Sequence, residues 1–173
     1  MEIKISSKLL HRGKHFSFLQ DEVELPDGKR IKRDIVAYPG AVAIVPVMDD
    51  GRIMLVRQYR YAAGRELLEI PAGTLEVGES VDDCAYRELR EETGYSASRL
   101  EKVISCYMAP GYSSEVIHYY VARGLTPVGS ELDLDEFIEV ETYSLEDILR
   151  MIKDNTIIDA KTVTGILTTF RLS

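Results

Sequence analysis

The sequence predicts a mixed α/β or α+β domain, a mixed sheet with helices on both sides, preceded by a β-rich N-terminal arm. Residues 41–48 form a nearly continuous apolar run, which is typical of a strand buried on both faces of its sheet. Start and stop signals for a helix bracket residues 80–94. The segment before them has turn chemistry and loose alternation but no helical period. We therefore divide the chain into an arm, residues 1–40, and a domain, residues 41–173.

The first half of the chain is predicted to consist mostly of strands. Residues 16–25 and 29–38 form a hairpin around the Pro-Asp-Gly turn at 26–28. After the apolar run, Asp-Asp-Gly at 49–51 turns the chain into a second hairpin arm at 52–60. A short apolar piece, Leu-Leu-Glu-Ile, then leads to Pro71.

The second half contains the helices. Ser80 and Asp83 form a capping box for a helix over 80–93, which Gly94 ends. Ser144 and Asp147 open a second helix that runs to about Lys153, and a last helix covers Ala160 to Phe170. Three further strands are expected at residues 103–108, 116–122 and 137–143.

Composition narrows the class of protein. A chain of 173 residues that is 45% hydrophobic can bury a sizeable core. Its net charge of −8 argues against binding to nucleic acid or an anionic membrane, both of which favour a basic surface. Cys84 and Cys106 lie far apart and fit neither a disulfide framework nor a zinc motif. Without a signal peptide or an apolar span, we expect a cytoplasmic protein.

The helix over 80–93 breaks its own amphipathic pattern. At 3.6 residues per turn, Glu88 and Glu92 fall on the same face as Cys84 and Leu89, and Glu91 lies at the edge of that face. Two carboxylates one turn apart on an apolar face repel each other and are costly to desolvate. The ordinary alternative is a helix whose charged residues all face solvent.

The surroundings of the helix favour a divalent metal site. Residues 69–92 contain eight acidic and two basic residues. The glycine-punctuated segment 71–79 lets backbone carbonyl groups approach the same space. Carboxylate and carbonyl oxygens are the ligands of Mg²⁺ or Mn²⁺, and the absence of a nearby histidine argues against zinc.

The spacing of these residues resembles the Nudix box, GX5EX7REUXEEXGU. Eight of its nine defined positions match, and the ninth is Tyr95, where the family has an aliphatic residue. The matching residues are Gly73, Glu79, Arg87, Glu88, Leu89, Glu91, Glu92 and Gly94. The resemblance implies an α/β/α sandwich around a mixed sheet, which hydrolyses a nucleoside diphosphate linked to another group.

The resemblance also implies residue roles. Glu88, Glu92 and the carbonyl group of Ala72 would bind Mg²⁺, and Glu91 would be a further ligand or a ligand's partner. Arg87 would pair with Glu79 and hold the loop against the helix. The alternative for that pair is a surface ion pair worth about 0–1 kcal/mol.

The flanking sequences resemble the ADP-ribose pyrophosphatase subgroup. Pro110 follows Tyr95 by 15 residues, and segments 25–28, 33–36 and 56–60 also look like that subgroup. It implies hydrolysis of ADP-ribose to AMP and ribose 5-phosphate. The residues that would contact substrate are Arg33, Arg60, Gly111 and Glu115.

Three questions stay open at this point. Glu136 aligns best with the subgroup's general base, while Asp133, Asp135 and Glu115 are alternatives. The substrate could instead be another nucleotide sugar such as GDP-mannose, or the chain could be a Nudix-fold module that binds a nucleotide without cleaving it. The arm predicts a homodimer with an exchanged N-terminal sheet, because an isolated hairpin is marginally stable, and the alternative is that it folds back on its own core.

Overall fold

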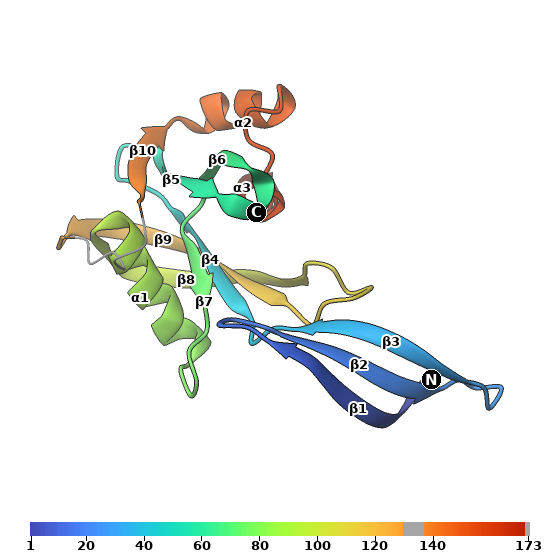
Figure 1. The fold of residues 1–173 in the computed structure, drawn as a ribbon. Coiled ribbons are helices and arrows are strands. Elements are labelled where there is room, and N and C mark those ends of the chain that lie inside the picture. Colours follow the sequence, from blue (N-terminus) through green and yellow to red (C-terminus); the bar gives the residue numbers. More distant parts are fainter. Residues whose placement is uncertain (130–136, 172–173) are drawn as a thin grey trace.

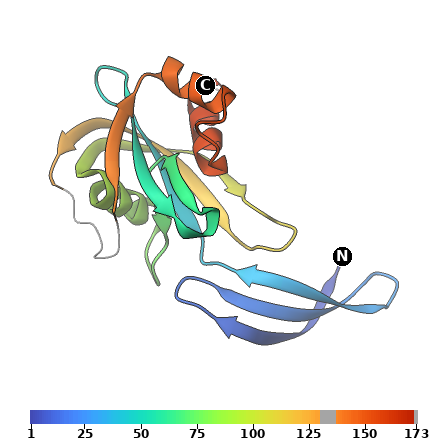
Figure 2. The same cartoon turned by 45° about the horizontal axis from the view of Figure 1, so that its top comes forward.

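The structure is a computed structural model that describes residues 1–129 and 137–171 (Figure 1). Its strands form three sheets, with the orders β1-β2-β3, β10-β5-β6 and β7-β4-β9-β8. The first sheet extends away from the other two, which lie together with the three helices (Figures 1 and 2).

The arm is a three-stranded antiparallel sheet rather than a two-stranded hairpin. The predicted hairpin is present as β2 (Ser17–Glu24) and β3 (Arg30–Ala37), and at its turn the amide of Gly28, at φ 82°, donates to the carbonyl group of Leu25 at 2.9 Å. The additional strand, β1 (Ile3–Arg12), was not predicted. Its register shifts twice against β2 and every residue is exposed, so no apolar alternation marks it in the sequence.

The central strand, β4 (Ala41–Pro46), is buried at all six positions, as its apolar run predicts. It pairs antiparallel with β7 (Ala72–Thr74) and parallel with β9 (Val116–Pro127), and β8 (Tyr95–Tyr107) forms the far edge of the sheet. The parallel pair makes this a mixed sheet, as expected.

A small sheet joins the core at the end of β4. Its strands are β5 (Ile53–Arg60), β6 (Arg65–Glu69) and β10 (Glu139–Tyr143), and a short 3₁₀ segment at Tyr61–Ala63 connects β5 to β6. Gly51, at φ 83°, closes the predicted turn before β5.

The helices cover both faces of the central sheet, as the sandwich prediction requires. α1 (Val81–Thr93) packs on the face that carries Val42 and Ile44, while α3 (Ala160–Arg171) packs on the opposite face. α2 (Leu145–Lys153) contributes Ile148 to the same core as α3. The caps of α1 are as predicted: the hydroxyl of Ser80 accepts from the amide of Asp83 at 3.1 Å.

Several strand boundaries differ from the prediction. β8 begins at Tyr95, directly after the helix stop, instead of at residue 103, and β9 runs on to Pro127. These extensions form a long two-stranded ribbon in which exposed and half-buried residues do not alternate regularly, so no period-two pattern marks them in the sequence. Among the helices that the structure describes, none is long and apolar enough to cross a membrane.

Candidate active site

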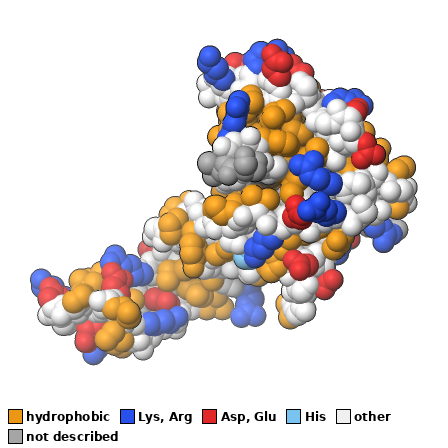
Figure 3. Space-filling model, turned by 180° about the vertical axis from the view of Figure 1, so that it is seen from behind, with side chains coloured by type: hydrophobic (Ala, Val, Ile, Leu, Met, Phe, Trp, Pro, Cys, Tyr) orange, Lys and Arg blue, Asp and Glu red, His pale blue; other side chains and the backbone are white. Residues whose placement is uncertain are grey.

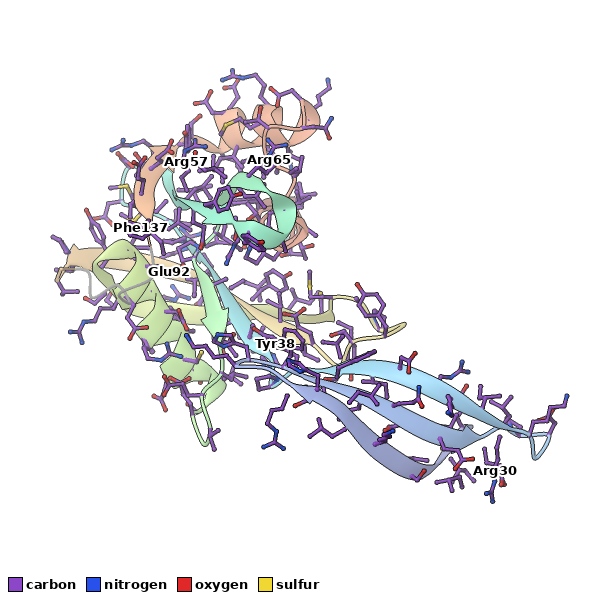
Figure 4. The ribbon with its side chains drawn as sticks, in the orientation of Figure 1. Arg30, Tyr38, Arg57, Arg65, Glu92 and Phe137 are labelled. Atoms are coloured by element: carbon purple, nitrogen blue, oxygen red, sulfur yellow. The ribbon has the colours of Figure 1, made fainter. Side chains whose placement is uncertain are left out.

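The two carboxylates that break the pattern of α1 are buried. Glu88 is 9% exposed and Glu92 is 4% exposed, beside Cys84, Ala85 and Leu89, which are fully buried. Figure 4 labels Glu92 on the side of α1 that faces the sheet. The fully solvated helix is therefore excluded, because these two acids lie on the apolar face.

The backbone of β7 receives both carboxylates. A Cβ atom placed on Gly73 would lie 1.8 Å from Cδ of Glu88, so only glycine leaves space for that side chain. Oε2 of Glu92 accepts a hydrogen bond from the amide of Ala72 at 3.0 Å. The segment 72–73 and α1 thus hold two carboxylates next to the backbone of β7.

Arg87 is the centre of an ion-pair cluster. Its Nε and Nη2 donate to the two carboxylate oxygens of Glu79 at 2.7 and 2.9 Å, which is the predicted pair. Its Nη1 donates to Glu88 at 2.7 Å and to Glu91 at 2.9 Å, and its Nη2 also reaches the carbonyl group of Thr74 at 3.2 Å. A guanidinium group with this many partners fixes the loop before α1 against the helix.

This cluster shifts the titration of its members. Hydrogen bonding from Arg87 lowers the pKa of Glu79 to about 2, and the hydrogen bond that Glu79 accepts from the amide of Glu76 contributes. Hydrogen bonding to Glu79 raises the pKa of Arg87. Burial raises the pKa of the Cys84 thiol to about 12. The Arg87–Glu79 pair therefore stays charged at neutral pH, while the thiol of Cys84 stays protonated.

The donor set fits a hard divalent cation. It consists of carboxylate oxygens and backbone groups, and the nearby thiol is protonated, so soft-metal binding is disfavoured. In the described residues, no three His, Cys, Asp or Glu side chains are already arranged around one metal position. Arg87 occupies one oxygen of Glu88 and one of Glu91 instead.

Arg60, a predicted substrate contact, lies at the end of β5 and pairs with Glu69 through two hydrogen bonds of 2.9 and 2.7 Å. This hydrogen bonding raises the pKa of Arg60 most, and the charge of Glu92 raises it further. Arg60 is therefore within electrostatic reach of the acidic face of α1.

Lys161 at the start of α3 is a residue that the sequence analysis missed. It forms an ion pair with the same Glu69 and a second one with Asp159 at 3.0 Å. The sequence contains a signal for such a partner, because Glu69 lies inside the apolar segment 67–70 and a glutamate that is buried there requires cationic partners.

Gly111 and Glu115 lie in the loop between β8 and β9, which is hydrogen-bonded to the end of β3. The amide of Val36 donates to the carbonyl group of Tyr112 at 2.8 Å. The amide of Ser114 donates to the carbonyl group of Val36 at 3.0 Å. Burial raises the pKa of Glu115, and the charge of Lys161 opposes this shift. A Cβ atom on Gly111 would meet nothing within 4 Å.

Arg33 is not brought to the acidic helix of its own chain. It lies in the middle of β3, where it pairs with Glu2 at 2.6 Å. The proposed general base Glu136, with Asp133 and Asp135, lies outside the described residues.

The sandwich fold and the buried carboxylates of α1 beside β7 are the features by which the chain is compared with known protein families. The family model of the NUDIX domain matches residues 37–164, and the chain belongs to the Nudix family.

Individual relatives are similar over nearly the whole chain. An ADP-ribose pyrophosphatase of Bacillus subtilis is 43% identical, with 95% of this chain and 90% of the relative covered. A methanol dehydrogenase activator of Bacillus methanolicus is 41% identical over the same shares of the two chains. An ADP-ribose pyrophosphatase of Mycobacterium tuberculosis is 39% identical, with 94% and 80% covered. A crystal structure of an ADP compounds hydrolase superposes with a TM-score of 0.85 at 26% identity, covering 97% of this chain and 91% of that one.

Proposed function

We propose that this Nudix enzyme hydrolyses the pyrophosphate bond of ADP-ribose, giving AMP and ribose 5-phosphate, with Mg²⁺ as its metal and Mn²⁺ as the alternative. The observation that carries the proposal is the pair of buried carboxylates, Glu88 and Glu92, held against the backbone of β7. Two relatives near 40% identity bear the name ADP-ribose pyrophosphatase.

The residues have distinct roles in this proposal. Glu88, Glu91, Glu92 and the carbonyl group of Ala72 hold the metal, which when bound neutralises phosphate charge and lowers the pKa of the attacking water. Arg87 orients the ligands: it already donates to two of the three carboxylates and anchors them to Glu79.

The substrate is held by a second group of residues. Arg60 donates to the pyrophosphate, since a guanidinium group suits phosphate oxygens. Glu115 binds the ribose or a metal-bound water, Gly111 lets the loop approach the ligand, and Arg33 contributes from the arm. Glu136 takes the proton of the attacking water, with Asp133, Asp135 and Glu115 as the alternatives.

A product assay with purified protein and Mg²⁺ tests the substrate. The panel contains ADP-ribose, GDP-mannose, NAD⁺ and a nucleoside triphosphate, because relatives named GDP-mannose pyrophosphatase are 34–35% identical over 72% of this chain. We expect kcat/KM to be highest for ADP-ribose, with AMP as a product. A higher kcat/KM for GDP-mannose would mean that GDP-mannose is the substrate. Binding of these compounds without cleavage would mean that the chain is a nucleotide-binding module.

We further propose that the chain is a homodimer in which the arm packs on the partner and contributes to its active site. One face of the arm carries apolar residues from all three strands, paired across the sheet. Leu9, Leu19, Ile31 and Ile35 are at least partly exposed, and Val23, which pairs with Ile31, is already buried in the single chain. Hydrophobic side chains also lie among charged ones on the arm in Figure 3. A second copy would cover this surface and bring Arg33 to an acidic helix that its own chain does not present to it.

Light scattering of the full chain at micromolar concentration tests the dimer. A mass twice the chain's 19.5 kDa is expected, and a mass near 19.5 kDa would mean that the arm folds without a partner. We place the protein in the cytoplasm, because Cys84 and Cys106 are both free thiols, which suits a reducing compartment.

A further inference from the structure

A buried carboxylate links Arg60 to the start of α3. Glu69, at the end of β6, is 1% exposed and forms ion pairs with both Arg60 and Lys161. Burial by itself would raise the pKa of Glu69, but the hydrogen bonds from Arg60 and the charge of Lys161 outweigh it, and the pKa lies below its ordinary value. Glu69 is therefore an anion that depends on two cations from different elements.

The pairing with Glu69 determines which edge of Arg60 remains available. Nε and Nη2 both donate to Glu69, at 2.9 and 2.7 Å, so the guanidinium plane is fixed by two bonds along one edge. Nη1 makes no hydrogen bond to any residue that the structure describes, and 41% of the Arg60 side chain is exposed. Held in this way, the guanidinium group keeps Nη1 as a donor for an anionic ligand, and the charge of Glu92 contributes to its electrostatic environment.

Lys161 is itself held rigidly. Its Nζ contacts Asp159 at 3.0 Å, and the same carboxylate oxygen of Asp159 accepts from the amide of Thr162 at 2.9 Å and from its hydroxyl at 2.6 Å. The hydroxyl of Thr162 in turn accepts from the amide of Ile70 at 2.9 Å. This hydrogen bond connects the first turn of α3 to Ile70, which follows Glu69 and lies two residues before Ala72.

We propose that Lys161 is a positioning residue for substrate binding, which acts through Glu69 to orient the guanidinium group of Arg60 toward the phosphates. This inference rests on the proposed function, because it takes Arg60 as a phosphate contact. Without Lys161, Arg60 is the one cation left in an ion pair with the buried Glu69 among the residues that the structure describes. The carboxylate of Glu69 is then no longer held from α3, and the guanidinium plane that it fixes loses its orientation, because a buried carboxylate with one partner removed is poorly stabilised.

The expected kinetic effect is on binding rather than on chemistry. Lys161→Met should raise the KM for ADP-ribose about tenfold, the effect of one weakened charged hydrogen bond. It should change kcat less than about threefold, because the carboxylates of α1 are held by Arg87 and by Ala72. Lys161→Arg, which keeps the cation, should restore most of the affinity.

A double-mutant cycle separates positioning from a structural role. Arg60→Ala raises KM by itself, and adding Lys161→Met to it should raise KM no further, because the residue through which Lys161 acts is gone. A residue that only supports the fold would lower the melting temperature and change KM equally in both backgrounds. Lys153→Met, at the exposed end of α2, is the matched control and should change neither kinetic parameter.

The outcomes are distinct. An unchanged KM in Lys161→Met, or a KM effect that persists in the Arg60→Ala background, would overturn the inference. If Lys161→Met does not fold, the double variant Glu69→Gln/Lys161→Met is used instead, because it removes the charges of both residues together. The same rise in KM is expected for it. If the wild type cleaves a different nucleotide sugar, the proposed substrate is wrong, yet the cycle measured on that substrate still decides the role of Lys161.

Discussion

The N-terminal sheet of this protein is wholly antiparallel and the central sheet is mixed, and the two have opposite surroundings. In β4 all six residues are buried between α1 and α3, whereas in β1 every residue is exposed. The central sheet is stabilised by apolar burial on both faces. The N-terminal sheet relies on its strand pairing and on surface ion pairs such as Arg33–Glu2 at 2.6 Å, which contribute little free energy.

This difference assigns separate tasks to the two regions. The buried region can hold carboxylates in fixed positions against backbone groups, because its surroundings do not rearrange. The exposed sheet has no such constraint from its own chain, so its apolar face is available to a second copy. Substitutions in the buried region should therefore change chemistry, and those in the arm should change assembly.

The largest effect is expected from Glu92→Gln. The amide oxygen of glutamine can still accept from the amide of Ala72, so the fold should persist, while the negative charge that a metal requires is lost. We expect kcat for ADP-ribose to fall at least about 10²-fold, as is typical when one preorganised electrostatic group is removed. Steady-state assays over a range of Mg²⁺ concentrations measure this, with Glu101→Gln on the exposed ribbon of β8 as the control. Near wild-type turnover would show that Glu92 is not a ligand.

A pair of glycine substitutions compares the two regions directly. Gly73→Ala places a methyl group 1.8 Å from the position of the Glu88 carboxylate, so that side chain must move and kcat should fall about tenfold or more. Gly28→Ala in the turn of the arm meets nothing within 4 Å but adopts φ 82°, which costs about 1 kcal/mol of unfolding free energy. Its kcat should equal that of the wild type. Loss of turnover in both variants would contradict the division of tasks.

The sequence was sufficient for elements whose local signals are strong. The caps Ser80 and Gly94 fixed α1, and the apolar run fixed β4, because each signal depends only on neighbouring residues. It was insufficient where contacts are long-range. β1 pairs through its backbone without an apolar pattern, and the partnership of Lys161 with Glu69 joins residues 92 positions apart.

The site was predictable to a similar degree. The position of Glu88 and Glu92 on a buried face follows from helical spacing, and their burial in the structure confirms it. The pairing of Arg87 with Glu79 is confirmed as well. The Arg60–Glu69 pair was missed, because adjacent strands bring these two residues together and one-dimensional spacing does not reveal it.

A smaller effect, confined to assembly, is expected from Leu9→Lys. Leu9 is 47% exposed in the single chain, so the charge should cost little in the monomer, but it would be buried against a partner. We expect the dissociation constant of the dimer to rise at least about tenfold, because burying an uncompensated charge is unfavourable. Light scattering over a concentration series measures it. Leu167→Lys, an exposed leucine on α3, is the matched control and should leave the dimer intact.

The smallest effect is expected from the pH dependence of the Arg87–Glu79 pair. The pKa of Glu79 is about 2 in the folded protein against an ordinary value of 4.5. Because the unfolded chain binds a proton more readily between these values, the pair contributes its full stability above pH 4.5 and loses it as the pH falls toward 2. We expect a loss of about 1 kcal/mol across that range, since solvent reduces the effect of a pair near the surface. Urea unfolding of the wild type and of Glu79→Gln at about pH 7, 5 and 3 measures the free energy of unfolding of both proteins and tests this. The difference between the two proteins should shrink toward pH 3, and a constant difference would mean that Glu79 stabilises the loop by packing and not by its charge.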